Sequence, residues 1–372
     1  MRIRDVVLQN RLAQPANARV WTFNIDLVDP VTEFKLDIRA KNHTTGPNDL
    51  GCIPYIVREF AVIDGSEVIA SMNGPQCFAM SCFNEGHAPM HWHQEMANME
   101  QHWCMPIQFG RHLTDPEWIF DPRKFRNPQL RIDFDLNLGT QVIGANGWLD
   151  TGPEITVWAK VMEEGARPRG YLMNKEVRSY NSTAGGTEIT WLPVDFLHRK
   201  LMIRCYKYFG DMNAPSDRIK VSQDQDKWIP FDLYGNDFQY LMRDWFPEVE
   251  FHLKHYMDDG ERREHFQGSG GGGVVVAAAN DRIVGVHDWA TNTFWLDIVD
   301  GAGADKTDVE VWSYGKTRNP FDCYCYPWGD QDIASEWLQV APMGNLRLLL
   351  DQDPNTGADY CVEIVCQQAH PY

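Results

Sequence analysis

Apolar and polar side chains alternate along many short segments of this chain. In residues 130–138, LRIDFDLNL, every second residue is apolar, and the residues between are charged or carry an amide. Successive side chains of a β-strand point to opposite faces, so this segment is predicted to be a strand with one buried and one solvated face. Such strands are typical of two sheets packed face to face.

Strands of this kind are predicted along the whole chain, with Pro- and Gly-rich turns between them. The other segments that fit strands are 20–28, 33–41, 154–162, 200–209, 293–301, 308–315, 346–353 and 360–368. No alternation of strands with helices is found, and no Gly-rich phosphate loop follows a strand. This argues against a nucleotide-binding α/β enzyme.

Two segments have the spacing of short helices. Residues 1–12 would place Ile3, Val6 and Val7 on one side of an amphipathic N-terminal helix. Residues 235–246 form the second candidate. All other regular structure is expected to be β.

The order of features in the first half of the chain recurs in the second half. Four pairs of segments match in the same order: 34–40 with 199–205, 52–69 with 228–242, 127–137 with 344–353, and 154–161 with 360–368. Internal similarity of this kind indicates two similar β-sandwiches in tandem, dividing near residues 187–193. Two unrelated β domains are the alternative.

Composition narrows the classes of function. The chain has 372 residues, enough for two domains. With 34 basic and 52 acidic side chains its net charge is −18, which repels phosphate, so nucleic-acid binding is not expected. No apolar run approaches the about 20 residues that cross a bilayer, and the N-terminus lacks the apolar core of a secretory signal. The nine cysteines show no C-x-x-C pair, which favours free thiols in a reducing cytosol.

Residues 86–103 hold the densest candidate chemistry, with four histidines and two glutamates. On a strand, the step from His91 to His93 would point both imidazoles the same way. Cupin enzymes hold a metal with such a step, so the pattern allows a cupin-like metal-dependent enzyme centred on His91 and His93.

The rest of this segment does not match a cupin. Glu95 and Glu100 stand at the wrong distance from His93, and Pro89 interrupts a helical arrangement of ligands. His87 and His102 complete the cluster without a recognised spacing. We therefore interpret it as a hydrogen-bonded loop or interface cluster, in which protonation of the histidines near pH 6 would weaken contacts. The metal-dependent enzyme remains the alternative.

Several motifs resemble the double jelly-roll major capsid proteins of icosahedral viruses. They are a strand carrying Ile38 and Arg39, an apolar stretch at 56–74 that contains an Asp-Gly-Ser turn, and the run 105–136. That run joins an Ile-x-Phe-Gly-Arg strand, an Asp-Pro loop and an Asn-Pro-Gln-Leu-x-Ile strand. The resemblance extends over the whole chain in architecture.

The resemblance implies an all-β fold of two tandem eight-stranded jelly rolls with short helices and long loops. An N-terminal amphipathic segment is expected at 1–19, a first jelly roll at 20–190 and a second at 191–372. It also implies a structural subunit that is not an enzyme, with no catalytic, cofactor-binding or metal-binding residue.

The implied function is that of the major capsid protein of a virus, a bacteriophage, whose homotrimers are the pseudo-hexameric capsomers of an icosahedral shell. The implied partners are other copies of the chain, penton and minor capsid proteins, and an inner viral membrane on which residues 1–12 could lie. No specific nucleic-acid binding is implied. The expected location is the virion, assembled in the host cytoplasm.

Overall fold

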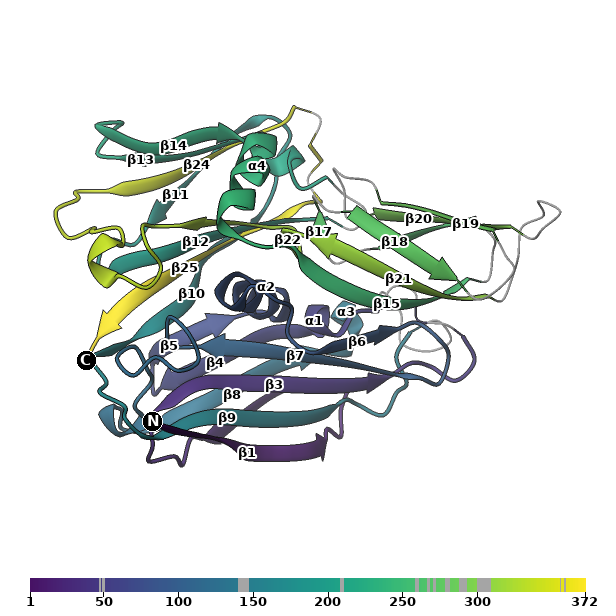
Figure 1. Cartoon of the computed structure of the whole chain (residues 1–372), viewed down its shortest axis with the longest axis horizontal. Helices are drawn as coiled ribbons and strands as arrows, with labels where there is room; N and C mark the ends of the chain where they lie inside the picture. The colour runs from purple at the N-terminus through teal and green to yellow at the C-terminus, as the bar shows by residue number, and fades with distance from the viewer. Residues whose placement is uncertain are drawn as a thin grey trace.

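The computed structural model of this chain consists mainly of β-strands, with a few short helices between them (Figure 1). It describes residues 1–46, 48, 51–139, 147–207, 211–257, 261–265, 268–269, 272–277, 282–287, 293–299, 309–354, 356–357 and 359–372. The expectation of an all-β fold is confirmed.

Two eight-stranded sheets form the body of the described structure. The first contains, in spatial order, β1 (Arg2–Ala13), β9 (Glu154–Glu164), β3 (Val31–Lys41), β7 (Glu100–Gln108), β6 (His91–Gln94), β15 (Val249–Met257), β21 (Val309–Thr317) and β18 (Gly272–Ala277). The second contains β2 (Ala18–Asn24), β8 (Pro128–Asp135), β4 (Val57–Asp64), β5 (Glu67–Met72), β10 (Gly170–Asn181), β25 (Cys361–Pro371), β12 (Leu197–Tyr206) and β23 (Cys323–Pro327).

Smaller sheets and helices complete the described structure. A four-stranded sheet contains β11 (Gly186–Leu192), β24 (Leu346–Gln352), β13 (Arg218–Gln223) and β14 (Trp228–Tyr234). The other sheets contain β16 (Glu261–His265), β20 (Thr293–Val299) and β19 (Arg282–His287), and β17 (Gly268–Ser269) with β22 (Asn319–Pro320). The helices are α1 (Ile53–Ile56), α2 (Gly74–Glu85), α3 (Leu136–Gly139) and α4 (Gly235–Trp245), with 3₁₀ turns at Pro122–Lys124, Ala214–Ser216 and Ala334–Glu336.

One strand order occurs twice in the chain. The orders β1-β9-β3-β7 and β2-β8-β4-β5 recur as β10-β25-β12-β23 and β11-β24-β13-β14. Helices α2 and α4 each follow the strand in fifth place. Three of the four predicted segment matches are confirmed, as β3 with β12, β8 with β24, and β9 with β25. The match of 52–69 with 228–242 is wrong by one strand, because β4 corresponds to β13 and not to β14.

Alternation in β8 produces the predicted buried face. Leu130, Ile132 and Phe134 are fully buried, while Arg131 and Asp133 are partly exposed. The strand predicted to continue to residue 138 ends at Asp135, because α3 begins at Leu136, and Leu138 is 48% exposed. The inward side chains meet those of the facing sheet in one continuous apolar core that extends through both sets of strands. Burial of this apolar surface is the main favourable contribution to folding.

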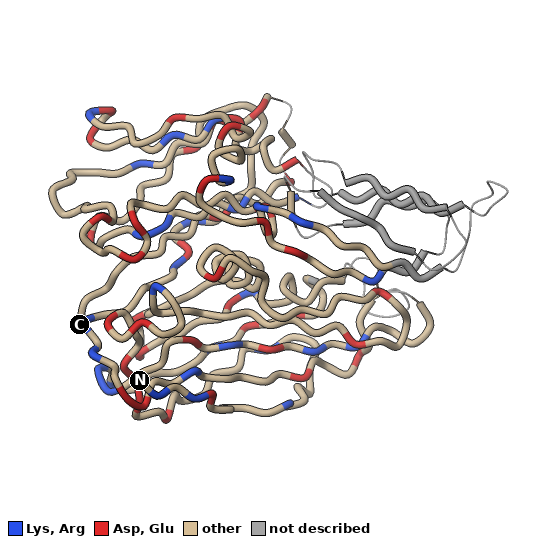
Figure 2. Tube along the Cα trace, in the orientation of Figure 1, with Lys and Arg blue, Asp and Glu red and all other residues tan. Residues whose placement is uncertain are grey.

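The predicted N-terminal helix is wrong, because residues 2–13 form strand β1 and pair antiparallel with β9. Val6 and Leu8 pack against the core while Val7 between them is 54% exposed, which is the period of a strand and not of a helix. Arg2 lies 2.7 Å from Glu163 on β9. Figure 2 shows basic and acidic segments close together around the N-terminus.

Two further expectations need correction, and one is confirmed. The loop expected around His91 is strand β6, although a short one. Helix α2 was not predicted. Helix α4 confirms the helix predicted at 235–246. No helix among the described residues is both long and apolar enough to cross a membrane.

Helix α2 is buried along most of its length, from Gly74 to Phe83. It begins with a capping box in which Asn73 and Gln76 bind each other's backbone N–H groups, and it ends at Gly86 with a φ of 73°. A side chain at position 74 would place its Cβ 2.2 Å from the carbonyl oxygen of Pro54, so only glycine fits there. Apolar residues on all sides of a helix are typical of complete burial.

Both large sheets run from the N-terminal strands β1–β9 into the C-terminal strands β10–β25 (Figure 1). The two junctions are parallel strand pairs, with β5 beside β10 and β6 beside β15. Helix α2 lies between these junctions, and its Phe78 ring is 5.7 Å from Phe251 and 5.3 Å from Phe321. We call this contact zone between β1–β9, with α1 and α2, and β10–β25 the seam.

Deleting residues 1–12 should destabilise the protein, because it uncovers the edge of β9. Unpaired edges of this kind promote aggregation. We expect a lower soluble yield and a lower melting temperature than for the full chain, measured by size-exclusion chromatography and differential scanning fluorimetry. The control is Val7→Ser, which keeps β1 and changes one exposed side chain. A deleted chain that matches the full chain in both measurements would contradict this role for β1.

Candidate functional site

The histidine strand β6 lies at one end of the seam, where it pairs with β7 on one side and with β15 on the other. The ring of His91 is 5.8 Å from Phe78, 5.1 Å from Trp103 and 5.3 Å from Phe251. The predicted common direction of His91 and His93 is confirmed, because both rings face Trp103.

His91 forms hydrogen bonds through both of its ring nitrogens, and the one through Nε2 crosses the seam. Its Nδ1 is 2.9 Å from the carbonyl oxygen of Pro89, and its Nε2 is 3.2 Å from the backbone nitrogen of His252. The carbonyl can only accept and the amide can only donate, so the ring is the neutral tautomer with its proton on Nδ1. Burial lowers the pKa of His91 to about 4, which keeps this arrangement intact at neutral pH.

The other histidines have separate partners. His93 is buried and lies 3.7 Å from Glu95, while His102 pairs with the buried Asp37 on β3. His87 and His112 are exposed. Among the described residues, no group of three or more His, Cys, Asp or Glu side chains is placed to hold a metal ion.

A second polar cluster lies at the N-terminal end of α2. Arg204 on β12 is 3.1 Å from Glu363 on β25, and both side chains are buried. Burial alone would raise the pKa of Glu363, but the charge of Arg204 and the amides of Asn73 and Gln76 lower it below its ordinary value. Gln76 of α2 also donates to Glu176 on β10. Two acidic side chains of the C-terminal strands therefore lie at the positive end of the helix dipole.

A third cluster lies at the C-terminal end of α2. Lys200 on β12 is fully buried and donates to the carbonyl oxygen of Phe83 at 2.9 Å. Arg199 beside it donates to the side-chain oxygen of Asn84 at 3.1 Å and to Gln367 at 2.7 Å. The charged guanidinium of Arg199 at this end complements the negative end of the helix dipole.

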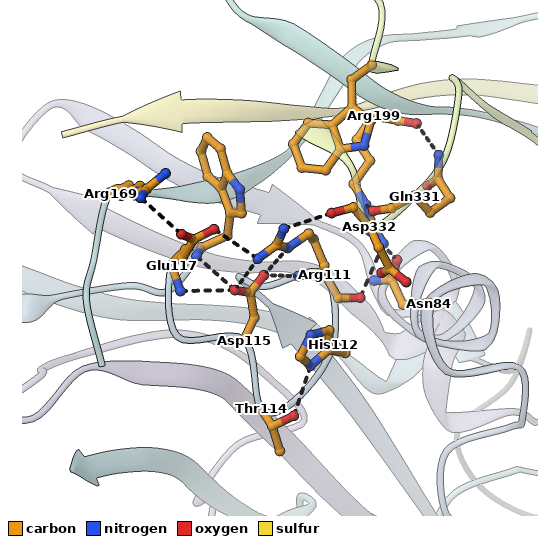
Figure 3. Close-up of polar contacts among 12 residues, drawn as sticks. Asn84, Arg111, His112, Thr114, Asp115, Glu117, Arg169, Arg199, Gln331 and Asp332 are labelled. Atoms are coloured by element: carbon orange, nitrogen blue, oxygen red, sulfur yellow. Dashed lines mark hydrogen bonds and ion pairs between the residues drawn. The ribbon is translucent and has the colours of Figure 1, made fainter. Parts of the chain in front are cut away.

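Figure 3 shows how this third cluster continues across the seam. Arg111, in the turn after β7, forms a bidentate pair with Asp115 and donates to the backbone oxygen of Asp332 at 2.7 Å. Arg199 donates to the backbone oxygen of Arg111 at 3.2 Å. The turn is thereby bound to strand β12 and to the loop before the last 3₁₀ turn.

These three clusters supply much of the polar contact across the seam. Of the three, only the histidines were predicted from the sequence. The missed signal was the pair Arg199–Lys200 and then Arg204 within an otherwise apolar strand, HRKLMIRCY. Charges are rarely placed in buried strands unless they are paired, so three cations in one such strand predict an internal polar layer. The arrangement fixes two parts of a protein against each other.

No protein-family model matches this chain, and no curated protein sequence matches it. Solved structures match it over almost its full length. The major capsid protein from bacteriophage PM2 aligns with a TM-score of 0.54 at 10% identity, covering 100% of this chain and 98% of that chain. A structure of Sulfolobus Turreted Icosahedral Virus aligns with a TM-score of 0.59 at 10% identity, covering 99% and 91%. The PBCV-1 virus capsid aligns with a TM-score of 0.57 at 9% identity, covering 99% and 93%.

The matched proteins contain two tandem jelly rolls, which accounts for the strand order that occurs twice here. The chain has the double jelly-roll fold. The seam is therefore the joint between its two jelly rolls, and α2 with its charged neighbours is the core of that joint. The cupin-like enzyme centred on His91 and His93 finds no support, because the double jelly roll accounts for the whole chain.

Acid should weaken the seam through His91. Its pKa is about 4 when folded and about 6.5 when unfolded. Between these values the unfolded chain binds more protons, so stability is complete above pH 6.5 and falls as the pH drops toward 4. We expect His91 to account for a loss of about 2–3 kcal/mol over this window. The pKa of His91 in the folded protein is therefore below the pH 6 at which protonation was expected from the sequence.

The measurement is urea unfolding at pH 7 and at pH 4.5 for the natural chain and for His91→Gln. Glutamine keeps an amide donor and acceptor but does not titrate. A smaller loss in the variant is the expected result, and an equal loss in both proteins would contradict the role of His91.

Replacing one member of the Arg204–Glu363 pair should lower the free energy of unfolding more than replacing both members with apolar residues. Glu363→Leu leaves a buried arginine without its counter-charge, which costs about 3–5 kcal/mol of unfolding free energy. Adding Arg204→Met to Glu363→Leu should recover part of that loss. The control is Asp232→Asn at the exposed pair with Arg218, with an expected change below about 1 kcal/mol. A double variant less stable than Glu363→Leu would contradict this account.

Proposed function

We propose that this chain is the major capsid protein of an icosahedral virus. The observation that carries this proposal is the full-length match of both jelly rolls to subunits of three viruses, one of them named as a major capsid protein. A likeness confined to one jelly roll would fit many β-sandwich proteins, because one fold hosts many functions. Proteins that match over two tandem jelly rolls from end to end form a much narrower class.

The seam supports this function physically. A shell subunit has to transmit load between neighbours without bending at its middle. Two sheets that continue through the joint, a buried helix between them, and buried hydrogen bonds from that helix to Glu363 and Lys200 make the two jelly rolls one rigid block. The proposed role is structural and requires no catalytic residue, cofactor or metal.

We propose that the first jelly roll comprises β1–β9 and the second β10–β25. This places the boundary between Glu164 and Gly170, which replaces the boundary expected between residues 190 and 191. Support comes from the repeated strand order, in which β10 and β11 take the places of β1 and β2. The proposed first jelly roll also includes residues 1–19, which were expected to form a separate segment.

The proposed working form is a homotrimer, in which three chains contribute six jelly rolls to one pseudo-hexameric capsomer. Exposed apolar side chains on the four-stranded sheet are candidate contacts between copies. Trp191 is 60% exposed and Ile189 42%, both on β11, and Tyr234 at the end of β14 is 57% exposed. Aromatic side chains of this kind are enriched in protein interfaces.

We further propose neighbouring capsomers, penton and minor capsid proteins as partners, in a phage virion assembled in the host cytoplasm. An inner viral membrane would have to be contacted by a surface other than the predicted N-terminal helix. The side chains of Arg2, Arg4 and Arg11 pair with glutamates on β9, so they are not free for lipid phosphates.

The first test is the mass of the purified chain in solution, measured by light scattering. We expect a metal-free trimer of three times the 42.8 kDa of one chain, and pseudo-hexagonal particles in negative-stain microscopy. A Trp191→Asp variant should shift the equilibrium toward monomers if β11 lies in the interface. Arg218→Asp, on the same sheet, serves as a matched control for added negative charge. A stable monomer or dimer that carries bound metal would contradict the proposed function.

A further inference from the structure

Lys200 and Asn84 meet inside the seam, although they belong to different jelly rolls. Lys200 is 1% exposed and comes from strand β12, while Asn84 is the penultimate residue of α2. The Nζ atom of Lys200 lies 2.5 Å from the side-chain oxygen of Asn84. It also donates to the carbonyl oxygen of Phe83 at 2.9 Å, which orients the amine beside the amide of the next residue.

The lysine has the properties of a buried nucleophile. It forms no ion pair with any carboxylate among the described residues. Burial lowers its pKa well below the ordinary value, and the neighbouring charge of Arg199 lowers it further. Burial of this kind favours the neutral amine, the form that carries a free lone pair and that enzymes use when lysine takes part in covalent chemistry.

The amide of Asn84 is held on both sides. Arg199 donates to its oxygen at 3.1 Å, and burial lowers the pKa of Arg199 only to about 10, so this guanidinium stays charged. On the other side, the amide nitrogen donates to Gln108 at 2.8 Å, and Gln108 donates to Glu85 at 2.9 Å. Figure 3 shows Asn84 and Arg199 facing each other at the end of α2.

We propose that Lys200 and Asn84 form an intramolecular isopeptide bond across the seam. The lone pair of Nζ attacks the side-chain carbonyl carbon of Asn84, and Arg199 stabilises the oxyanion that develops on its oxygen. The bond from that carbon to the amide nitrogen then breaks. One proton passes from Nζ to the leaving nitrogen, ammonia departs, and an amide joins the two side chains. No oxidant, reductant or cofactor is consumed.

Such a bond would make the joint between the jelly rolls covalent. Asn84 is only partly buried, which leaves a path for ammonia to escape and makes the reaction irreversible in practice. The bond would close a loop of more than one hundred residues, and a cross-link over a long loop restricts the unfolded chain strongly. This consequence does not depend on the capsid function proposed above.

The test is mass spectrometry of the full-length natural chain after folding and incubation at neutral pH. We expect an intact mass lower than the sequence mass by one molecule of ammonia. After denaturation and trypsin digestion we expect no cleavage after Lys200, and a branched peptide that contains both Asn84 and Lys200. Peptide mapping also separates this product from a succinimide at either Asn–Gly step, 73–74 or 146–147, which would release ammonia too.

Two variants complete the experiment. Lys200→Met removes the nucleophile, and Asn84→Asp replaces the amide with a carboxylate that has no ammonia to release. Both should show their full calculated mass. The decisive result comes from the natural chain alone. The test therefore remains valid even when one of the two variants does not fold. A natural chain at full sequence mass, with normal cleavage after Lys200, would overturn the proposal.

Discussion

The buried helix α2 sets the main constraint on this structure. A helix ends in unpaired N–H groups at one terminus and unpaired carbonyl groups at the other, and burial without partners is costly. Here the capping box of Asn73 and Gln76 satisfies backbone N–H groups at the first terminus, and the second jelly roll supplies further partners at both ends. Glu363 acts at the first turn through Asn73 and Gln76, and Lys200 binds the carbonyl of Phe83 near the last turn. The helix of one jelly roll is thus completed by charges from the other.

This dependence explains why the seam combines polar and apolar contacts. Rings such as Phe78 and Phe251 exclude water, and in the low dielectric that results the hydrogen bonds to the helix ends become stronger. The same low dielectric penalises any charge that loses its partner. The two jelly rolls are therefore fixed in one relative orientation, since sliding by even one residue would separate Asn73 and Gln76 from Glu363.

Local patterns in the sequence predicted the strands well and the seam poorly. The alternation in 130–138 identifies β8, since one face of that strand meets solvent. Helix α2 escaped because it is apolar on all sides, so its sequence lacks the 3.6-residue period that marks a half-exposed helix. The N-terminal segment was misassigned because the apolar residues of 1–12 fit both the helical and the strand period. Only the pairing of this segment with β9 shows that it is a strand. The partners of Lys200 are more than one hundred residues away, and a single sequence does not reveal such contacts.

The two parallel junctions also determine when the protein can become complete during synthesis. Strands β5 and β6 end the sheets of the first jelly roll, and their partners β10 and β15 come later in the chain. Glu363, whose carboxylate binds Asn73 and Gln76 of α2, lies on β25, the last strand of the second jelly roll. A nascent chain therefore emerges from the ribosome with two open sheet edges and an apolar helix that lacks its partners from the second jelly roll, features that bind chaperones and cause misassembly. Strands β10 and β15 close the two edges, and β25 then brings Glu363 to the helix.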